Sequence, residues 1–368
     1  MRRSTVTVII PAHNEEEGLP ATLDSVLSQT IRPDEVIVID DASTDRTGEV
    51  ARSYGARVRV LRPPANLGSK AKAQNHALPH CTTDLILAVD ADTVLAPDYI
   101  ERVAPAFDDP GVTVAAGNVQ TRHTRTLWER GRSTEYLFGF HWHRPIQQAA
   151  GSPMVCSGCC SIFRRTDLAA AGGFPERTIV EDMDYTWTQQ IAGRKALYVS
   201  SATAWAADPE TLLYLRKQLN RWMAGFCQNI RIHARSLIRH KPILAIWVLL
   251  SLLEIVTAPA WWAAPFIAAW TTDTPLPLTL TTWSATELLL TTPPLIYAAH
   301  RRKLPLPQIL LNLPCVYANK AVNLYYAWRA VLTELLLVPL GVTPGLTTYE
   351  KGRPDSPQRP PREATMTT

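Results

Sequence analysis

Residues 85–92 read Leu-Ile-Leu-Ala-Val-Asp-Ala-Asp, a charge-free apolar run that ends in two aspartates. A short run of this kind predicts a buried strand. Two carboxylates one residue apart, at a strand end where the backbone turns, can face one cavity, and such oxygen ligands suit Mg²⁺. Aspartates are also common turn residues after strands. Asp90 and Asp92 taken alone therefore leave a metal site and a simple turn as alternatives.

The same arrangement of an apolar run followed by polar residues occurs upstream. Apolar runs at 6–10, 35–39 and 58–61 alternate with helical patterns at 19–29, 44–54 and 70–78. This alternation predicts an α/β fold in which helices cover both faces of a parallel sheet. Ligands of such sheets bind beyond the carboxyl ends of the strands, where this chain places His13, Glu15 and Asp41. No Gly-x-Gly-x-x-Gly follows a run, which disfavours a dinucleotide-dependent oxidoreductase.

Two later motifs carry groups suited to transfer chemistry. Asp182 lies in an acidic stretch and can act as a general base toward a hydroxyl, although an acidic helix start is the simpler alternative. Residues 218–222 read Gln-Leu-Asn-Arg-Trp. Arg221 offers two donors to phosphate oxygens, and Trp222 offers a face on which a sugar ring can stack. The alternative for this motif is an aromatic and basic belt where a helix meets a membrane.

Two long apolar segments follow, at 243–270 and 277–299, and both are long enough to span a bilayer. Basic residues flank them at 231–241 and 301–303. With both flanks inside, the positive-inside rule places the N-terminal part in the cytoplasm. We therefore expect a multi-pass protein of the cell (inner) membrane with a cytoplasmic catalytic domain. The alternative is a large buried helical core.

The remaining regions are less distinctive. Further apolar segments at 304–318 and 330–340 are short and interrupted by proline, and the composition of 349–368 predicts a disordered tail. The net charge of the 368 residues is only +4, which argues against a nucleic-acid partner.

The order of these motifs resembles that of the inverting family 2 glycosyltransferases, in particular the membrane poly-N-acetylglucosamine, chitin, hyaluronan and cellulose synthases. The resemblance covers roughly residues 4–230 and includes Lys70 in an Asn-Leu-Gly-Ser-Lys stretch. It implies a GT-A fold, a Rossmann-like mixed sheet, for a catalytic domain at 1–230. Interfacial and transmembrane helices would occupy 231–348.

The resemblance also implies roles for individual residues. Asp182 would be the catalytic base and Asp92 the ligand of a Mg²⁺ or Mn²⁺ cofactor. The remaining positions would bind the donor and the acceptor. The nucleotide-sugar residues would be Pro11, His13, Glu15, Asp41, Lys70 and Asp90, and the acceptor and diphosphate residues would be Gln218, Arg221 and Trp222.

Stretches at 117–122 and 181–187 are most similar to poly-N-acetylglucosamine synthases, and residues 156–160 are closer to chitin and hyaluronan synthases. These likenesses favour UDP-N-acetylglucosamine as the donor and a β-linked polysaccharide as the product. Val180 departs from the family, which commonly has Thr there, and the catalytic domain starts almost at Met1, without the N-terminal membrane helices of many synthases.

The departures leave alternatives open. One is the transfer of a single sugar to a lipid-linked or protein acceptor, and another is a catalytically silent membrane protein that binds nucleotide sugars. The expected partners are a nucleotide-diphosphate sugar, a glycan or lipid-linked acceptor and membrane lipid, with a homo-oligomer or an export partner left open.

Overall fold

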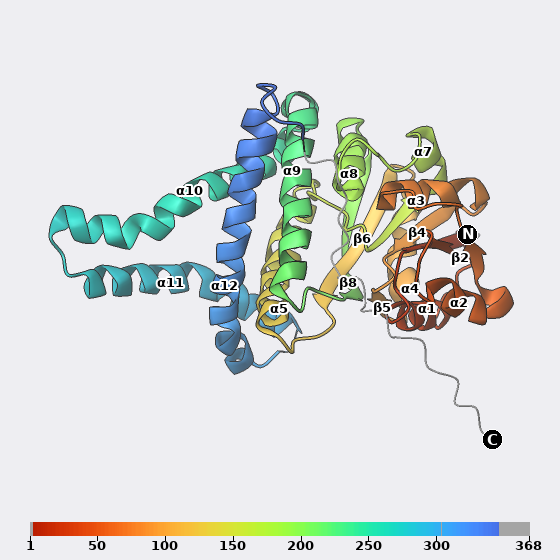
Figure 1. Ribbon diagram of the computed structural model, residues 1–368, viewed down its shortest axis with the longest axis horizontal. Coiled ribbons are helices and arrows are strands. Elements are labelled where there is room, and N and C mark those ends of the chain that lie inside the picture. Colours follow the sequence, from red (N-terminus) through yellow and green to blue (C-terminus); the bar gives the residue numbers. More distant parts are fainter. Residues whose placement is uncertain (1–2, 303, 346–368) are drawn as a thin grey trace, which may run out of the picture.

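The computed structural model describes residues 3–302 and 304–345, and one mixed sheet dominates its N-terminal part (Figure 1). Within the described residues the sheet has eight strands in the order β3-β2-β1-β4-β7-β6-β8-β5. The strands are β1 Val6–Ala12, β2 Glu35–Asp40, β3 Arg59–Leu61, β4 Leu85–Val89, β5 Val94–Leu95, β6 Val112–Thr121, β7 Cys160–Arg164 and β8 Lys195–Ala206.

The four strands predicted from the apolar runs are all present, and β4 has the predicted bounds. They pair in parallel, as expected: β1 with β2 and β4, and β2 with β3. The rest of the sheet is mixed, because β7 runs antiparallel to both β4 and β6 while β8 is parallel to β6. The sheet is therefore GT-A-like rather than purely parallel.

Short helices cover both faces of the sheet. The helices are α1 Leu19–Leu27, α2 Thr47–Ser53, α3 Lys70–Ala77, α4 Tyr99–Val103, α5 Leu127–Phe138, α6 Arg144–Ala149, α7 Arg165–Ala170 and α8 Glu181–Ile191. Alternate residues of β1 point to opposite faces. Val8 and Ile10 belong to a core that includes α1 and α4, whereas Ile9 belongs to a second core with α3 and α8.

The C-terminal part is made of long helices. They are α9 Leu212–His240, α10 Pro242–Thr272, α11 Leu276–Arg302, α12 Leu306–Ala330 and the π-helix η5 Val331–Leu337. Figure 1 shows α10 and α11 as a hairpin that projects away from the sheet, with α9 and α12 standing across its root. Because α9 is unbroken, the domain boundary placed after residue 230 falls within this helix, and the boundary stays a prediction.

One helix in the described part of the chain, α10, is long and apolar enough to cross a membrane. Its large side chains are mostly exposed, with Leu249 at 61% and Trp270 at 86%, so α10 is not a buried core helix of this chain. The second expected span corresponds to α11, which is less apolar, and a multi-pass topology stays a prediction.

The expectation that proline interrupts the segment at 304–318 is wrong, because α12 runs through Pro314 without ending. Tertiary packing supports this helix. Gly131 on α5 allows a close approach, since a Cβ added there would lie 2.6 Å from the carbonyl oxygen of Cys315. The predicted tail at 349–368 lies outside the described residues.

Candidate active site

A cavity of about 1150 Å³ opens at the carboxyl ends of β1, β2 and β4 and extends to the long helices. All eleven candidate residues line it, although they come from six different parts of the chain. They are Pro11, His13, Glu15, Asp41, Lys70, Asp90, Asp92, Asp182, Gln218, Arg221 and Trp222.

Lys70 lies among carboxylates at the centre of the cavity. Helix α3 begins at Lys70, since the Ser69 side chain caps the first turn. The Lys70 ammonium lies 2.5 Å from Asp90 and 3.5 Å from Glu181, and it donates to the carbonyl of Gly158 at 3.0 Å. Burial raises the pKa of Glu181, and the charge of Lys70 opposes this rise.

Asp182 lies in the first turn of α8, beside the same glycine. Its Oδ2 accepts a hydrogen bond from the backbone N–H of Gly158 at 2.7 Å, and its Oδ1 accepts one from the backbone N–H of Met183 at 2.8 Å. Both partners are amides that can only donate. The carboxylate is thus held in one orientation and keeps lone pairs with which it can accept a proton from a hydroxyl.

The end of the cavity at β1 and β2 is built from backbone-anchored side chains. His13 Nδ1 lies 2.8 Å from the carbonyl of Asp41, and Asp41 Oδ1 accepts from the N–H of Leu67 at 2.8 Å. The other Asp41 oxygen has no partner in the part of the chain that the structure describes, so it can accept one N–H from a base. The neighbouring Asp40 is fully buried and paired with Arg62, which makes it a structural residue.

Gln218 and Trp222 are held by Arg132, a residue that the sequence did not single out. Arg132 is buried on α5 and donates to Gln218 Oε1 at 3.1 Å and to Glu135 Oε2 at 2.7 Å. Its guanidinium carbon lies 5.0 Å from the centroid of the Trp222 ring. Residues 132 and 218 are 86 positions apart, and no local pattern links them.

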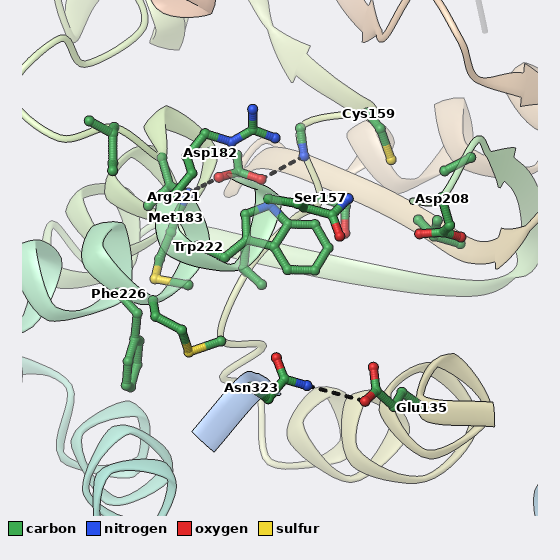
Figure 2. Close-up of a pocket in the computed structure, with 18 of the residues that line it drawn as sticks. Glu135, Ser157, Cys159, Asp182, Met183, Asp208, Arg221, Trp222, Phe226 and Asn323 are labelled. Carbon is green, nitrogen blue, oxygen red and sulfur yellow. Dashed lines mark hydrogen bonds between the residues drawn. The ribbon is translucent and has the colours of Figure 1, made fainter. Parts of the chain in front are cut away.

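Five carboxylates that were not predicted as site residues also line the cavity, and Asp208 and Glu135 are two of them. Burial raises the pKa of Asp208 to about 6, and the Tyr136 hydroxyl donates to it at 2.9 Å. Burial also raises the pKa of Glu135, which accepts from Asn323 at 3.1 Å. Figure 2 shows Asp182 on one side of the Trp222 ring and the Glu135–Asn323 pair on the other.

Val180, the residue that departs from the family pattern, packs against α9. A Cβ added at Gly225 would overlap a Val180 methyl group. The glycine therefore lets α9 approach the turn that carries Asp182.

The chemistry of the lining fits a divalent cation. Among the described residues, ten Asp or Glu side chains line the cavity against four Lys or Arg side chains. A diphosphate entering this acidic site would need a compensating charge, and Asp90 and Asp92 supply hard oxygen ligands for it. No group of three His, Cys, Asp or Glu side chains that could hold a metal occurs within residues 3–302 and 304–345. Asp90 and Asp92 would therefore supply only part of a coordination shell. This suits Mg²⁺ or Mn²⁺, which take further ligands from phosphates and water.

A GT-A-like mixed sheet with an acidic cavity at the ends of its parallel strands defines a glycosyltransferase. Residues 7–171 match the family model described as Glycosyl transferase family 2, so the chain carries a family 2 glycosyltransferase domain, as the resemblance predicted.

Relatives of the chain include known synthases. Over 263 residues it is 31% identical to the uncharacterized glycosyltransferase YaiP of Escherichia coli (68% of this chain, 63% of that protein) and to hyaluronan synthase of Streptococcus pyogenes (66% and 62%). It is 27% identical over 223 residues to poly-beta-1,6-N-acetyl-D-glucosamine synthase of Staphylococcus aureus (60% and 54%). The chain thus spans less than two thirds of the length of these curated relatives.

A solved structure shares more of the architecture. The mannosyltransferase PcManGT from Pyrobaculum calidifontis, in complex with GDP-Man and Mn²⁺, superposes with a TM-score of 0.64 at 25% identity. The match covers 82% of this chain and 87% of that one, so it extends beyond the catalytic sheet into the C-terminal helices.

Proposed function

We propose that this protein is a membrane-bound, inverting glycosyltransferase. It would transfer N-acetylglucosamine from the donor UDP-N-acetylglucosamine to a growing β-linked polysaccharide. The observation that carries the proposal is the position of Asp182. This carboxylate is fixed by two backbone amides beside the Lys70–Asp90 pair, in the same cavity as Arg221 and Trp222. The hyaluronan and poly-N-acetylglucosamine synthases among the relatives support both the product class and the donor.

In this proposal the groups that bind the nucleoside, the diphosphate and the acceptor occupy successive parts of the cavity. His13, Glu15 and Asp41 bind the nucleoside beside Pro11, and Lys70 with Asp90 positions the donor sugar and diphosphate. Asp182 removes the proton from the acceptor hydroxyl, which attacks the anomeric carbon from the face opposite the leaving diphosphate. Arg221 holds the diphosphate, while Gln218 and Trp222 place the acceptor.

Asp92, with Asp90 beside it, would hold the Mg²⁺ or Mn²⁺ cofactor. The cation supplies charge compensation for the departing diphosphate. The excess of acidic over basic side chains in the lining supports this role. The Mn²⁺ bound in the mannosyltransferase structure is consistent with it.

The α10–α11 hairpin would insert into the cell (inner) membrane and leave the catalytic sheet on the cytoplasmic side. The exposed apolar side chains of α10 support insertion, and Arg301 and Arg302 end α11 on the side where α10 begins. Helices α9 and α12 would then lie along the membrane surface, since they stand across the root of the hairpin (Figure 1). Alkaline carbonate extraction tests this, because an inserted protein stays with the membrane.

A second candidate is the transfer of one sugar to a lipid-linked acceptor. The observation that favours it is the likeness to a mannosyltransferase over most of both chains, C-terminal helices included.

The test is a donor screen with the full chain in detergent or native membranes. Labelled UDP-N-acetylglucosamine, other UDP-sugars and GDP-mannose are supplied, and both nucleoside diphosphate release and product size are measured. A polymer from UDP-N-acetylglucosamine supports the main proposal, a single addition supports the second candidate, and turnover of GDP-mannose alone overturns the donor assignment. An Asp182→Asn variant serves as the control for background hydrolysis.

A further inference from the structure

The cavity does not end at Trp222 but continues between the long helices. Beyond the indole ring it is lined by Glu135 on α5, Glu254 and Trp261 on α10, Glu287 on α11, and Lys320 and Asn323 on α12. Ionisable groups set among apolar helices are costly unless they have a function. Their position next to the transfer site suggests that they bind part of a substrate.

The one cation among these helix-side residues, Lys320, is already paired. Lys320 lies 3.1 Å from Glu287, and Arg132, behind the lining, donates to Glu135 at 2.7 Å. Glu254 is exposed, and no partner for its carboxylate occurs among the described residues. A bound carboxylate or sulfate would therefore meet three carboxylates and one paired cation among these residues, and like charges at short range repel each other.

One acceptor without a hydrogen-bond partner lines this end of the cavity. Asn323 Oδ1 is buried, lines the cavity and has no hydrogen-bond partner in the described chain, whereas the unpartnered donor Arg132 Nε lies behind the lining. Buried acceptors without partners are uncommon and call for a donor from outside the protein. Hydroxyl and ammonium groups donate hydrogen bonds, whereas an ionised carboxylate can only accept them.

Aromatic rings complete the lining. Trp222 and Trp261 both face this part of the cavity, and the Trp261 indole N–H is fixed by a 2.9 Å bond to Glu287. Flat indole faces bind the apolar faces of sugar rings and leave the hydroxyls at the ring edge for polar partners.

We propose that the helix side of this cavity is an acceptor site selective for neutral or amine-bearing sugars and that it excludes sugar chains carrying carboxylates. The proposal rests on the glycosyltransferase function proposed above. If the proposal holds, this chain binds a different class of acceptor from the hyaluronan synthases among its relatives, since hyaluronan carries a carboxylate on every second sugar.

Binding of three tetrasaccharides to the full chain in detergent tests the proposal. The probes are an N-acetylglucosamine tetramer, its de-N-acetylated form and a hyaluronan tetrasaccharide, and the readout is tryptophan fluorescence. We expect the hyaluronan probe to bind at least about tenfold more weakly than the other two, because Glu135, Glu254 and Glu287 would repel its carboxylates. Equal or tighter binding of the hyaluronan probe overturns the proposal. Tryptophan fluorescence reports binding without turnover. A failure of this proposal can therefore be told apart from a failure of the proposed transferase function, which would appear as no turnover of any donor.

A pair of variants with opposite expected effects excludes a merely structural explanation. Glu287→Gln frees Lys320, so the discrimination against the hyaluronan probe should narrow. Lys320→Met removes the cation, so the preference for the amine-bearing probe should increase. Glu101→Gln, on the distant helix α4, is the matched control and should leave the selectivity unchanged. Selectivity that shifts in the same direction in both variants overturns the proposal.

Discussion

The guanidinium of Arg132 lies over the indole of Trp222, 5.0 Å from the ring centroid, and joins that ring to Gln218 and Glu135. The contact connects helix α5 with the motif at the start of α9. Because Arg132 is buried and does not line the cavity, it acts on a substrate only by positioning Trp222 and Gln218.

Replacement of Arg132 by Lys should lower kcat about tenfold or more while changing the donor KM little, because lysine keeps the charge but lacks the planar fork that reaches two acceptors. Steady-state kinetics of nucleoside diphosphate release measure this split. Arg102→Lys, on an exposed face of α4, is the control. A rise in donor KM without a loss in kcat would show that Arg132 does not position the acceptor side.

Replacement by asparagine should affect two aspartates on helix α8 differently, lowering turnover at one and stability at the other. Asp182→Asn should lower turnover by about 10²-fold or more with little change in thermal stability, because it removes a proton acceptor. Asp184 is fully buried and accepts from His233 at 2.8 Å and from Arg177 at 2.7 Å, which ties α8 to α9.

Asp184→Asn should therefore destabilise the fold by roughly 2 kcal/mol, since it removes the charge of a buried carboxylate that is hydrogen-bonded to His233 and to the half-exposed Arg177. Thermal unfolding in detergent and turnover of the same preparations separate the two effects. If Asp182→Asn unfolds the chain as Asp184→Asn does, its loss of activity says nothing about a base.

The metal role of Asp92 predicts a shift in metal dependence rather than a simple loss of activity. EDTA should abolish turnover, and Mn²⁺ or Mg²⁺ should restore it. Asp92→Asn should raise the metal concentration for half-maximal turnover by about tenfold or more, because one charged oxygen ligand is lost. Asp98→Asn, on the surface, is the control. An unchanged metal requirement in Asp92→Asn would remove Asp92 from the set of ligands.

The sequence alone predicted strands β1 to β4, because these strands are continuous apolar runs that end in polar residues. It did not reveal the antiparallel part, where β7 pairs between β4 and β6 although it follows both in the chain. Residues such as Arg132 and Asn323 were missed for the same reason. Their partners lie 86 and 188 positions away, and only the folded chain brings them together.

Asp208 makes the stability of the fold depend on pH in a direction opposite to that of an ordinary ion-paired carboxylate. Burial raises its pKa from 3.8 to about 6, although Arg132 and the Tyr136 hydroxyl oppose this rise. The folded chain therefore holds the proton more tightly than the unfolded chain. The resulting stabilisation is complete below about pH 4 and is lost as the pH rises through about 6, a change of about 3 kcal/mol.

An Asp208→Asn variant has no proton to lose, so its stability should lack this dependence. Unfolding of both proteins in detergent between pH 5 and pH 8 measures the difference, and the wild type should lose stability relative to the variant across that range. Glu101→Gln, far from the cavity, should follow the wild type. Parallel pH profiles for the wild type and Asp208→Asn would show that the buried carboxyl titrates in its usual range. Asp208 would then already be ionised below pH 5, and its negative charge would persist at the acceptor end of the cavity under all these conditions.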